Sequence, residues 1–216
     1  MRLRLPLLLV VVILVTSPEG LNYGRPHAAS PEGLDYGRPA APRGRVVAVG
    51  DVHGAADAFA AILQRAELID RQQKWIGGNA ILVQTGDVTD RGPGVRAALD
   101  LLMALEPQAA AAGGRVHALL GNHEIMNMLG ETRDVTPEIF ASFGGEPAYR
   151  EAFGPAGRYG RWLRAKSPLV RVNDSLFMHA GINPDVTTAS IDELNAEVRQ
   201  LIARWDEGVR SLEEKQ

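Results

Sequence analysis

The 216-residue sequence contains no cysteine. The protein can therefore have neither a disulfide framework nor a metal site with thiolate ligands. The absence of cysteine does not distinguish a reducing from an oxidising compartment. Nor is there an excess of basic residues, because 23 Lys and Arg stand against 26 Asp and Glu and the formal net charge is -3. With no basic stripe in the sequence, this charge balance argues against a nucleic-acid-binding protein.

The N-terminal hydrophobic run, residues 7–15, is shorter than the ~20 residues that a transmembrane helix needs. Arg2 and Arg4 precede it, in the arrangement typical of a secretory signal peptide. Residues 1–16 are therefore predicted to export the chain, so that the protein is secreted or periplasmic. An uncleaved membrane anchor is the alternative, because no clean cleavage motif follows the run.

Residues 17–44 are predicted to be a disordered linker. The decapeptide at 17–26 returns at 30–39 with one change, Asn22 to Asp35, and both copies are rich in Pro and Gly without a periodic apolar face. The folded domain is expected over 45–206, followed by a polar tail over 207–216. A chain of this length favours one sizeable domain over two.

Three short apolar runs alternate with helical patterns in the first half of the domain. The runs cover 46–49, 80–83 and 116–120, while apolar residues recur at helical spacing over 59–66 and 95–105. This β-α-β-α-β order predicts an α/β fold with a largely parallel sheet and right-handed crossovers.

The second half of the domain is less regular. Residues 125–166 are predicted to form a helical insertion near the mouth of the site. Two short strands, 169–172 and 176–178, are predicted to form a hairpin. Ser190 and Glu193 have the spacing of a capping box at the start of a final amphipathic helix.

Polar residues of the kinds that bind metal and phosphate follow each predicted strand. The carboxyl ends of parallel strands meet at one edge of a sheet, where ligands usually bind, so these side chains are expected to lie together. Mixed imidazole and oxygen ligands suit Mn, Fe or Zn better than Ca. The candidate residues are Asp51, His53, Asp87, Asp90, Arg91, Asn122, His123 and His179.

Two divalent ions ~3.5–4 Å apart need one ligand that touches both, and a carboxylate suits this role. Asp87 is predicted to be the bridge. Asp51 and His53, separated by one residue, would bind one ion with it, and Asn122 and His179 would serve the other.

The remaining candidates suit phosphoester hydrolysis. The planar guanidinium of Arg91 can grip two phosphoryl oxygens at once. The predicted nucleophile is a metal-bound hydroxide, since the ions lower the pKa of bound water toward ~7. His123 is the candidate acid for the leaving alkoxide, with Asp90 hydrogen-bonded to its other nitrogen.

Each of these residues alone has a simpler reading. An Asp-x-His turn is more often a surface loop, a lone strand histidine such as His179 or His117 more often a core residue, and an Asp90–Arg91 ion pair is worth little at a surface. Asn122 alone could serve turn chemistry. Four strand-end motifs with complementary roles favour one functional site instead.

The motifs at 50–54, 86–92, 121–124 and 179–181 resemble, in order, those of the metallophosphoesterase family. They are most similar to its calcineurin-like phosphoprotein phosphatase branch, and residues 160–182 resemble the Shewanella-like protein phosphatases in particular. The resemblance covers about 45–205. It implies an αββα sandwich of mixed sheets flanked by helices, two metal ions, commonly Mn, and the ligand and catalytic roles given above.

One departure from the family pattern stands out. The resemblance implies a further metal-ligating histidine on a Gly-His-Thr-like turn well beyond His179, and no histidine follows His179 in this sequence. We therefore expect either a fragment whose C-terminal half of the sandwich is incomplete or a weakly bound second ion.

The leading functional hypothesis is a metal-dependent protein phosphatase acting on phosphoserine/threonine or phosphotyrosine in a protein or peptide. Hydrolysis of dinucleoside polyphosphates is the enzymatic alternative, and the Asp90–Arg91 pair favours the protein phosphatases. A non-catalytic, phosphoprotein-binding remnant is the alternative outside enzymes.

Overall fold

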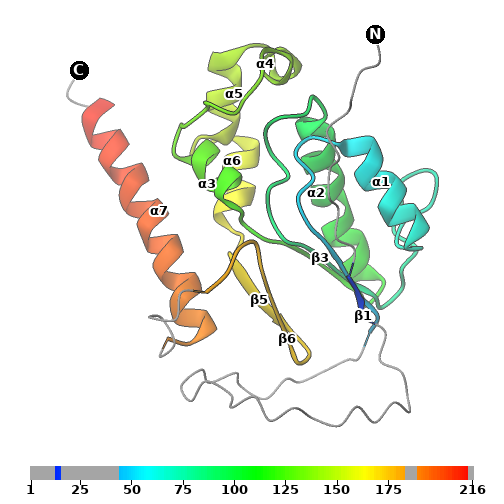
Figure 1. The fold of residues 1–216 in the computed structure, drawn as a ribbon. Helices are drawn as coiled ribbons and strands as arrows, with labels where there is room; N and C mark the ends of the chain where they lie inside the picture. The colour runs from blue at the N-terminus through cyan, green and yellow to red at the C-terminus, as the bar shows by residue number, and fades with distance from the viewer. Residues whose placement is uncertain (1–12, 16–43, 183–188, 214–216) are drawn as a thin grey trace.

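The computed structural model describes residues 13–15, 44–182 and 189–213, and its central element is a four-stranded sheet (Figure 1). The strand order is β1-β2-β3-β4. β2 (Val46–Val49), β3 (Ile81–Gln84) and β4 (Arg115–Ala118) are parallel, and β1 (Ile13–Val15) pairs antiparallel with β2. The predicted parallel sheet is therefore confirmed. Apart from β1 and residue 44, the predicted signal and linker segments lie outside the described residues.

The two crossover helices cover one face of this sheet. α1 (Ala56–Arg65) joins β2 to β3, and α2 (Val95–Ala111) joins β3 to β4. Alternate strand residues such as Val47 and Leu82 are fully buried in the same core as Phe59 of α1 and Leu102 of α2. The apolar stripes of the helices thus match the strand residues that point toward them.

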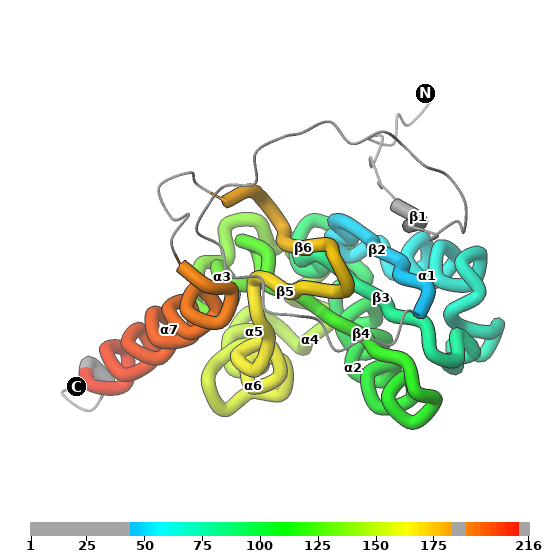
Figure 2. The backbone as a smooth tube through the Cα atoms, turned by 90° about the horizontal axis from the view of Figure 1, so that it is seen from below, coloured from blue at the N-terminus to red at the C-terminus, as the bar shows by residue number. Residues whose placement is uncertain are grey.

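A hairpin covers the other face. β5 (Leu169–Val172) and β6 (Ser175–Met178) are antiparallel, as predicted, with Asn173 in the left-handed region at φ +54°. The opposite strand residues, such as Ala48 and Val83, form a second core with Val172 of the hairpin. Figure 2 shows the hairpin beside the main sheet. Helices, sheet and second sheet are layered as the family resemblance implies.

Four short helices occupy the predicted insertion. They are α3 (Asn122–Met128), α4 (Pro137–Phe143), α5 (Glu146–Phe153) and α6 (Arg158–Arg164). Aromatic rings from the last three pack together, and the fully buried Tyr149 and Phe153 lie 4.5 Å apart between ring centroids. These rings join the main core rather than forming a separate one.

α7 (Ile191–Glu213) packs on β5, and Figure 1 shows it on the far side of the hairpin from α1 and α2. The predicted capping box is present, with Ser190 N–H donating to Glu193 Oε2 (2.7 Å) and Glu193 N–H to Ser190 Oγ (3.2 Å). The helix continues past the predicted start of the tail at 207. Within the described ranges, no helix combines the length and hydrophobicity that a membrane span requires.

Candidate active site

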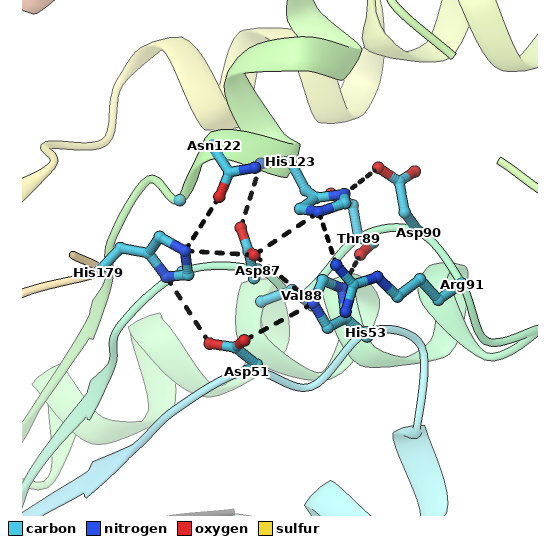
Figure 3. A network of polar contacts seen from close by, with 12 residues as sticks. Asp51, His53, Asp87, Val88, Thr89, Asp90, Arg91, Asn122, His123 and His179 are labelled. Atoms are coloured by element: carbon cyan, nitrogen blue, oxygen red, sulfur yellow. Dashed lines mark hydrogen bonds and ion pairs between the residues drawn. The ribbon is translucent and has the colours of Figure 1, made fainter. Parts of the chain in front are cut away.

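The candidate side chains come from loops at the carboxyl ends of the strands. Asp51 and His53 follow β2, Asp87 to Arg91 follow β3, Asn122 and His123 open α3 after β4, and His179 follows β6. Figure 3 shows five of these side chains around Asp87, namely Asp51, His53, Asn122, His123 and His179, with Asp90 and Arg91 beside His123. The sheet edge predicted to carry the site does so because three parallel strands end there together.

Asp87 lies at the centre of the group and is almost completely buried. Its Oδ2 is 3.2 Å from His179 Nε2, 3.5 Å from His53 Nε2 and 3.8 Å from His123 Nε2. Its other oxygen, Oδ1, accepts the backbone N–H of His123 at 3.1 Å. One carboxylate oxygen is thus surrounded by three imidazole nitrogens, which places Asp87 where a bridging ligand would have to be.

Asp51 and Asn122 complete the predicted ligand set from the more open side. The two oxygens of Asp51 each lie 3.7 Å from a ring nitrogen, Nε2 of His53 and Nδ1 of His179. Asn122 Oδ1 is 3.1 Å from His179 Nε2. The five predicted metal ligands are therefore brought together by the fold.

The ligand atoms form two overlapping groups that share Asp87. One group is Asp51, Asp87 and His179, and the other is His53, Asp87 and His123, each with its atoms within 4.8 Å of one another. This grouping differs in part from the predicted one, since Asp51 lies as close to His179 as to His53. It also brings His123 Nε2 within reach of a cation.

Two orphaned nitrogens indicate that the cluster suits cations. His53 Nδ1 lies 2.8 Å from the carbonyl oxygen of Thr89, and because a carbonyl can only accept, Nδ1 carries the proton. The lone pair of His53 Nε2 then faces Asp87 and is buried without a hydrogen-bond partner. His179 Nδ1 is likewise buried and unpartnered beside Asp51. Lone pairs facing carboxylates repel them, and a divalent cation between them removes the repulsion.

His123, Asp90 and Arg91 form the second part of the site. His123 Nδ1 donates to Asp90 Oδ2 at 2.7 Å, and both side chains are buried. A guanidinium nitrogen of Arg91, Nη2, lies 3.3 Å from His123 Nε2. The exposed arginine thus stands at the mouth of the site, beside the nitrogen that faces Asp87.

Comparison with known proteins decides the family. Residues 44–212 match the sequence model of the calcineurin-like phosphoesterase family. The chain belongs to this family. The resemblance predicted from the four motifs is therefore confirmed.

Two relatives and one solved structure are similar to this family member. Shewanella-like protein phosphatase 1 of Plasmodium berghei is 35% identical over 72% of this chain and 44% of its own. A symmetrical bis(5'-nucleosyl)-tetraphosphatase of Salmonella paratyphi A is 31% identical over 65% of this chain and 45% of its own. The crystal structure of a cold-active protein-tyrosine phosphatase from a psychrophilic Shewanella species gives a TM-score of 0.67 at 31% identity, covering 88% of this chain and 58% of that one. The chain spans about half the length of the curated relatives it matches.

Glu124 has a structural role that was not predicted from the sequence. Its carboxylate is buried and accepts the backbone N–H groups of Asp87 (2.7 Å), Val88 (2.8 Å), Thr89 (3.0 Å) and Gly121 (2.9 Å). The Glu at the third position of α3, the same spacing as in a capping box, was the available signal. Glu124 thereby fixes the loop that carries Asp87 against the start of α3.

The loop after β3 has unusual backbone geometry. Asp87, Asp90 and Arg91 have φ values of +57°, +69° and +65°. Such left-handed residues cost on the order of 1–3 kcal/mol each and persist only where surrounding contacts enforce them. Close packing adds a constraint at Gly121, where a Cβ would lie 2.2 Å from Asp87 Oδ1. This glycine allows the two strand ends to approach.

Proposed function

We propose that this chain carries the catalytic centre of a metal-dependent phosphoprotein phosphatase. The observation that carries the proposal is the position of Asp87 Oδ2, within 3.8 Å of three imidazole nitrogens and shared by two potential cation groups. This arrangement fits two neighbouring divalent ions better than one. Mixed N and O ligands favour Mn²⁺, with Fe or Zn as alternatives.

The proposed ligands are the five residues predicted from the strand ends. Asp51, His53, Asn122 and His179 would hold the ions together with Asp87. Bound divalent ions polarise phosphoryl oxygens and lower the pKa of coordinated water toward ~7. The protein contributes the buried carboxylate and the fixed tautomer of His53, whose Nδ1–H bond to Thr89 aims Nε2 at the cluster.

Two residues act on the substrate directly, and Asp90 acts through one of them. The guanidinium of Arg91 is exposed at the site and binds phosphoryl oxygens in a bidentate manner. Arg91 can only donate, so His123 Nε2 accepts from it in the structure. With Arg91 on the phosphoryl oxygens instead, a protonated Nε2 would give its proton to the oxygen of the leaving group. Asp90 accepts the Nδ1–H bond and stabilises the positive charge that the ring carries before transfer.

A phosphorylated protein segment is the proposed substrate. Asp51 is 47% exposed at its side chain and Arg91 is exposed, so the centre is open to a macromolecule rather than enclosed. The names of the Plasmodium relative and of the Shewanella structure, both protein phosphatases, support this choice. The tetraphosphatase relative supports the alternative, hydrolysis of dinucleoside polyphosphates.

The test of this proposal compares the turnover of two kinds of substrate. One kind is a matched set of phosphoserine, phosphothreonine and phosphotyrosine peptides, followed by phosphate release, and the other is diadenosine tetraphosphate. We expect turnover of at least one peptide with Mn²⁺, none with a chelator, and none in Asp87→Asn with either. Faster turnover of the dinucleotide than of every peptide would favour the alternative substrate. Calorimetry that finds one ion per chain, together with no turnover of any substrate, would favour a phosphoprotein-binding remnant.

We also propose that residues 1–16 direct export. The support is the pair of arginines before a short hydrophobic run. Cell fractionation of the full chain and of a variant lacking residues 2–15 tests this proposal. Export that does not depend on these residues would contradict it, and membrane retention of the full chain would favour the anchor.

A further inference from the structure

A buried chain of hydrogen bonds runs from the helical insertion to Asp90. The hydroxyl of Tyr149, on α5, donates to Asn127 Oδ1 at 2.6 Å. Asn127 Nδ2, on α3, lies 3.0 Å from both oxygens of Asp90. Asp90 Oδ2 accepts from His123 Nδ1 at 2.7 Å, so Tyr149 is linked to His123 through two side chains. All four residues are at most 3% exposed.

The contacts of Asn127 determine which way its amide faces. Its Nδ2 also donates to the carbonyl oxygen of His123 at 2.9 Å, so this end meets acceptors only. Its Oδ1 meets the Tyr149 hydroxyl. In the reversed amide, Oδ1 would face the Asp90 carboxylate, which is repulsive. Nδ2 would then face the Tyr149 hydroxyl, whose proton would have no acceptor.

The position of the Tyr149 hydroxyl is fixed by aromatic packing. The ring contacts Phe140, Phe143 and Phe153 with centroid separations of 5.3, 4.8 and 4.5 Å. Burial, together with the nearby charges of Asp90 and Glu124, raises the pKa of Tyr149 well above its usual value. The hydroxyl therefore keeps its proton and remains the donor to Asn127.

We propose that Asn127 and Tyr149 are positioning residues that hold the Asp90 carboxylate in line with His123 Nδ1. The inference rests on the proposed function, in which His123 is the proton donor. Asp90 has a left-handed φ of +69°, and the contacts of Asn127 Nδ2 with both of its carboxylate oxygens fix where the side chain points. Helix α5, through Tyr149, thus sets the geometry of proton donation.

Tyr149→Phe is the decisive variant, since it keeps the ring in the aromatic cluster and removes only the donor. Tyr159→Phe is its matched control. Tyr159 lies in the same cluster, 5.7 Å from Phe153 between centroids, but its hydroxyl donates to Asp100 on α2 at 2.9 Å. Each variant loses one tyrosine hydrogen bond, buried for Tyr149 and partly buried for Tyr159, so the free energy of unfolding of both variants is measured beside their kinetics.

Steady-state kinetics with two leaving groups provide the first readout. Phenolate needs proton donation more than p-nitrophenolate does. We expect Tyr149→Phe to lower kcat for phenyl phosphate about tenfold and for p-nitrophenyl phosphate less than about threefold, with KM unchanged. Asn127→Ala should show the same selectivity and Tyr159→Phe neither effect. Equal losses on both substrates, or none, would overturn the proposal.

Nuclear magnetic resonance of the Zn²⁺-loaded protein gives a readout that does not require turnover. The low-field proton of His123 Nδ1–H, identified by its loss in Asp90→Asn, should shift or broaden in Tyr149→Phe and stay unchanged in Tyr159→Phe. Its absence from the wild-type spectrum, or identical spectra for the two tyrosine variants, would overturn the proposal. A wild-type chain that hydrolyses neither phosphate ester would contradict the proposed function while the spectra still decide the positioning role.

Discussion

The carboxylate of Glu124 accepts the backbone N–H of Asp87 at 2.7 Å, joining the start of α3 to the loop after β3 across 37 positions of sequence. The two loops that deliver Asp87 and His123 are therefore held as one unit. Neither loop could move without leaving several buried N–H groups unsatisfied, which is costly in a low-dielectric interior.

Glu124→Gln is expected to destabilise the protein. The amide has one acceptor oxygen where the carboxylate has two, and its NH2 group would face backbone donors. We expect the free energy of unfolding to fall by about 3 kcal/mol, measured by urea denaturation. Glu151→Gln, at an exposed position on α5, is the control and should change it by less than about 0.5 kcal/mol. Equal stability of the two variants would contradict the bracing role.

Asp87→Asn is expected to abolish binding of both ions together, because Asp87 belongs to both ligand groups. Metal content per chain, measured by plasma mass spectrometry after dialysis against Mn²⁺, checks this. The exposed Asp57→Asn should retain the wild-type content. One ion retained at full occupancy in Asp87→Asn would show that Asp87 does not bridge.

His123→Ala separates the two roles that the geometry allows for this side chain. As a proton donor, its loss should lower turnover by about 10²–10³-fold and leave the metal content intact. As a metal ligand in the group with His53 and Asp87, its loss should also remove metal. His117→Gln, a histidine on β4 outside both groups, is the control for both measurements.

His117 is expected to make the folded state sensitive to acid. Burial, and then the nearby charge of Arg115, lowers its pKa from 6.5 to about 4. Between pH 6.5 and 4 the unfolded chain takes up a proton that the folded chain does not, so stability falls as the pH falls through this window. Replacing His117 by Gln should therefore raise Tm relative to wild type progressively from pH 6.5 to 4, and not above pH 7. A Tm difference independent of pH would refute this.

The sequence predicted the parts of the fold whose signals are local. β2 coincides with its predicted range, and the capping box of α7 begins at Ser190 as expected, because a buried apolar run and a cap each depend on adjacent residues. The candidate residues of the site could be gathered from the sequence because each follows directly on a strand. Their convergence then follows from parallel topology.

The residues that support the site could not be found in this way. Tyr149 lies 22 positions from Asn127, and nothing near it in the sequence distinguishes it from Tyr159, which bonds elsewhere. The grouping of Asp51 with His179 likewise depends on how the hairpin packs on the sheet. Such contacts arise from tertiary packing between helices of seven or eight residues, which carry little periodic signal.

The left-handed residues after β3 have a consequence for engineering this protein. Glycine adopts such φ values without strain, so Arg91→Gly would relieve the backbone while removing the group assigned to phosphate binding. Asp90→Gly would not give this gain, because it would leave buried His123 Nδ1 and Asn127 Nδ2 without their acceptor. A screen for thermostability that does not also measure activity would therefore select substitutions in this loop that raise stability and lower turnover.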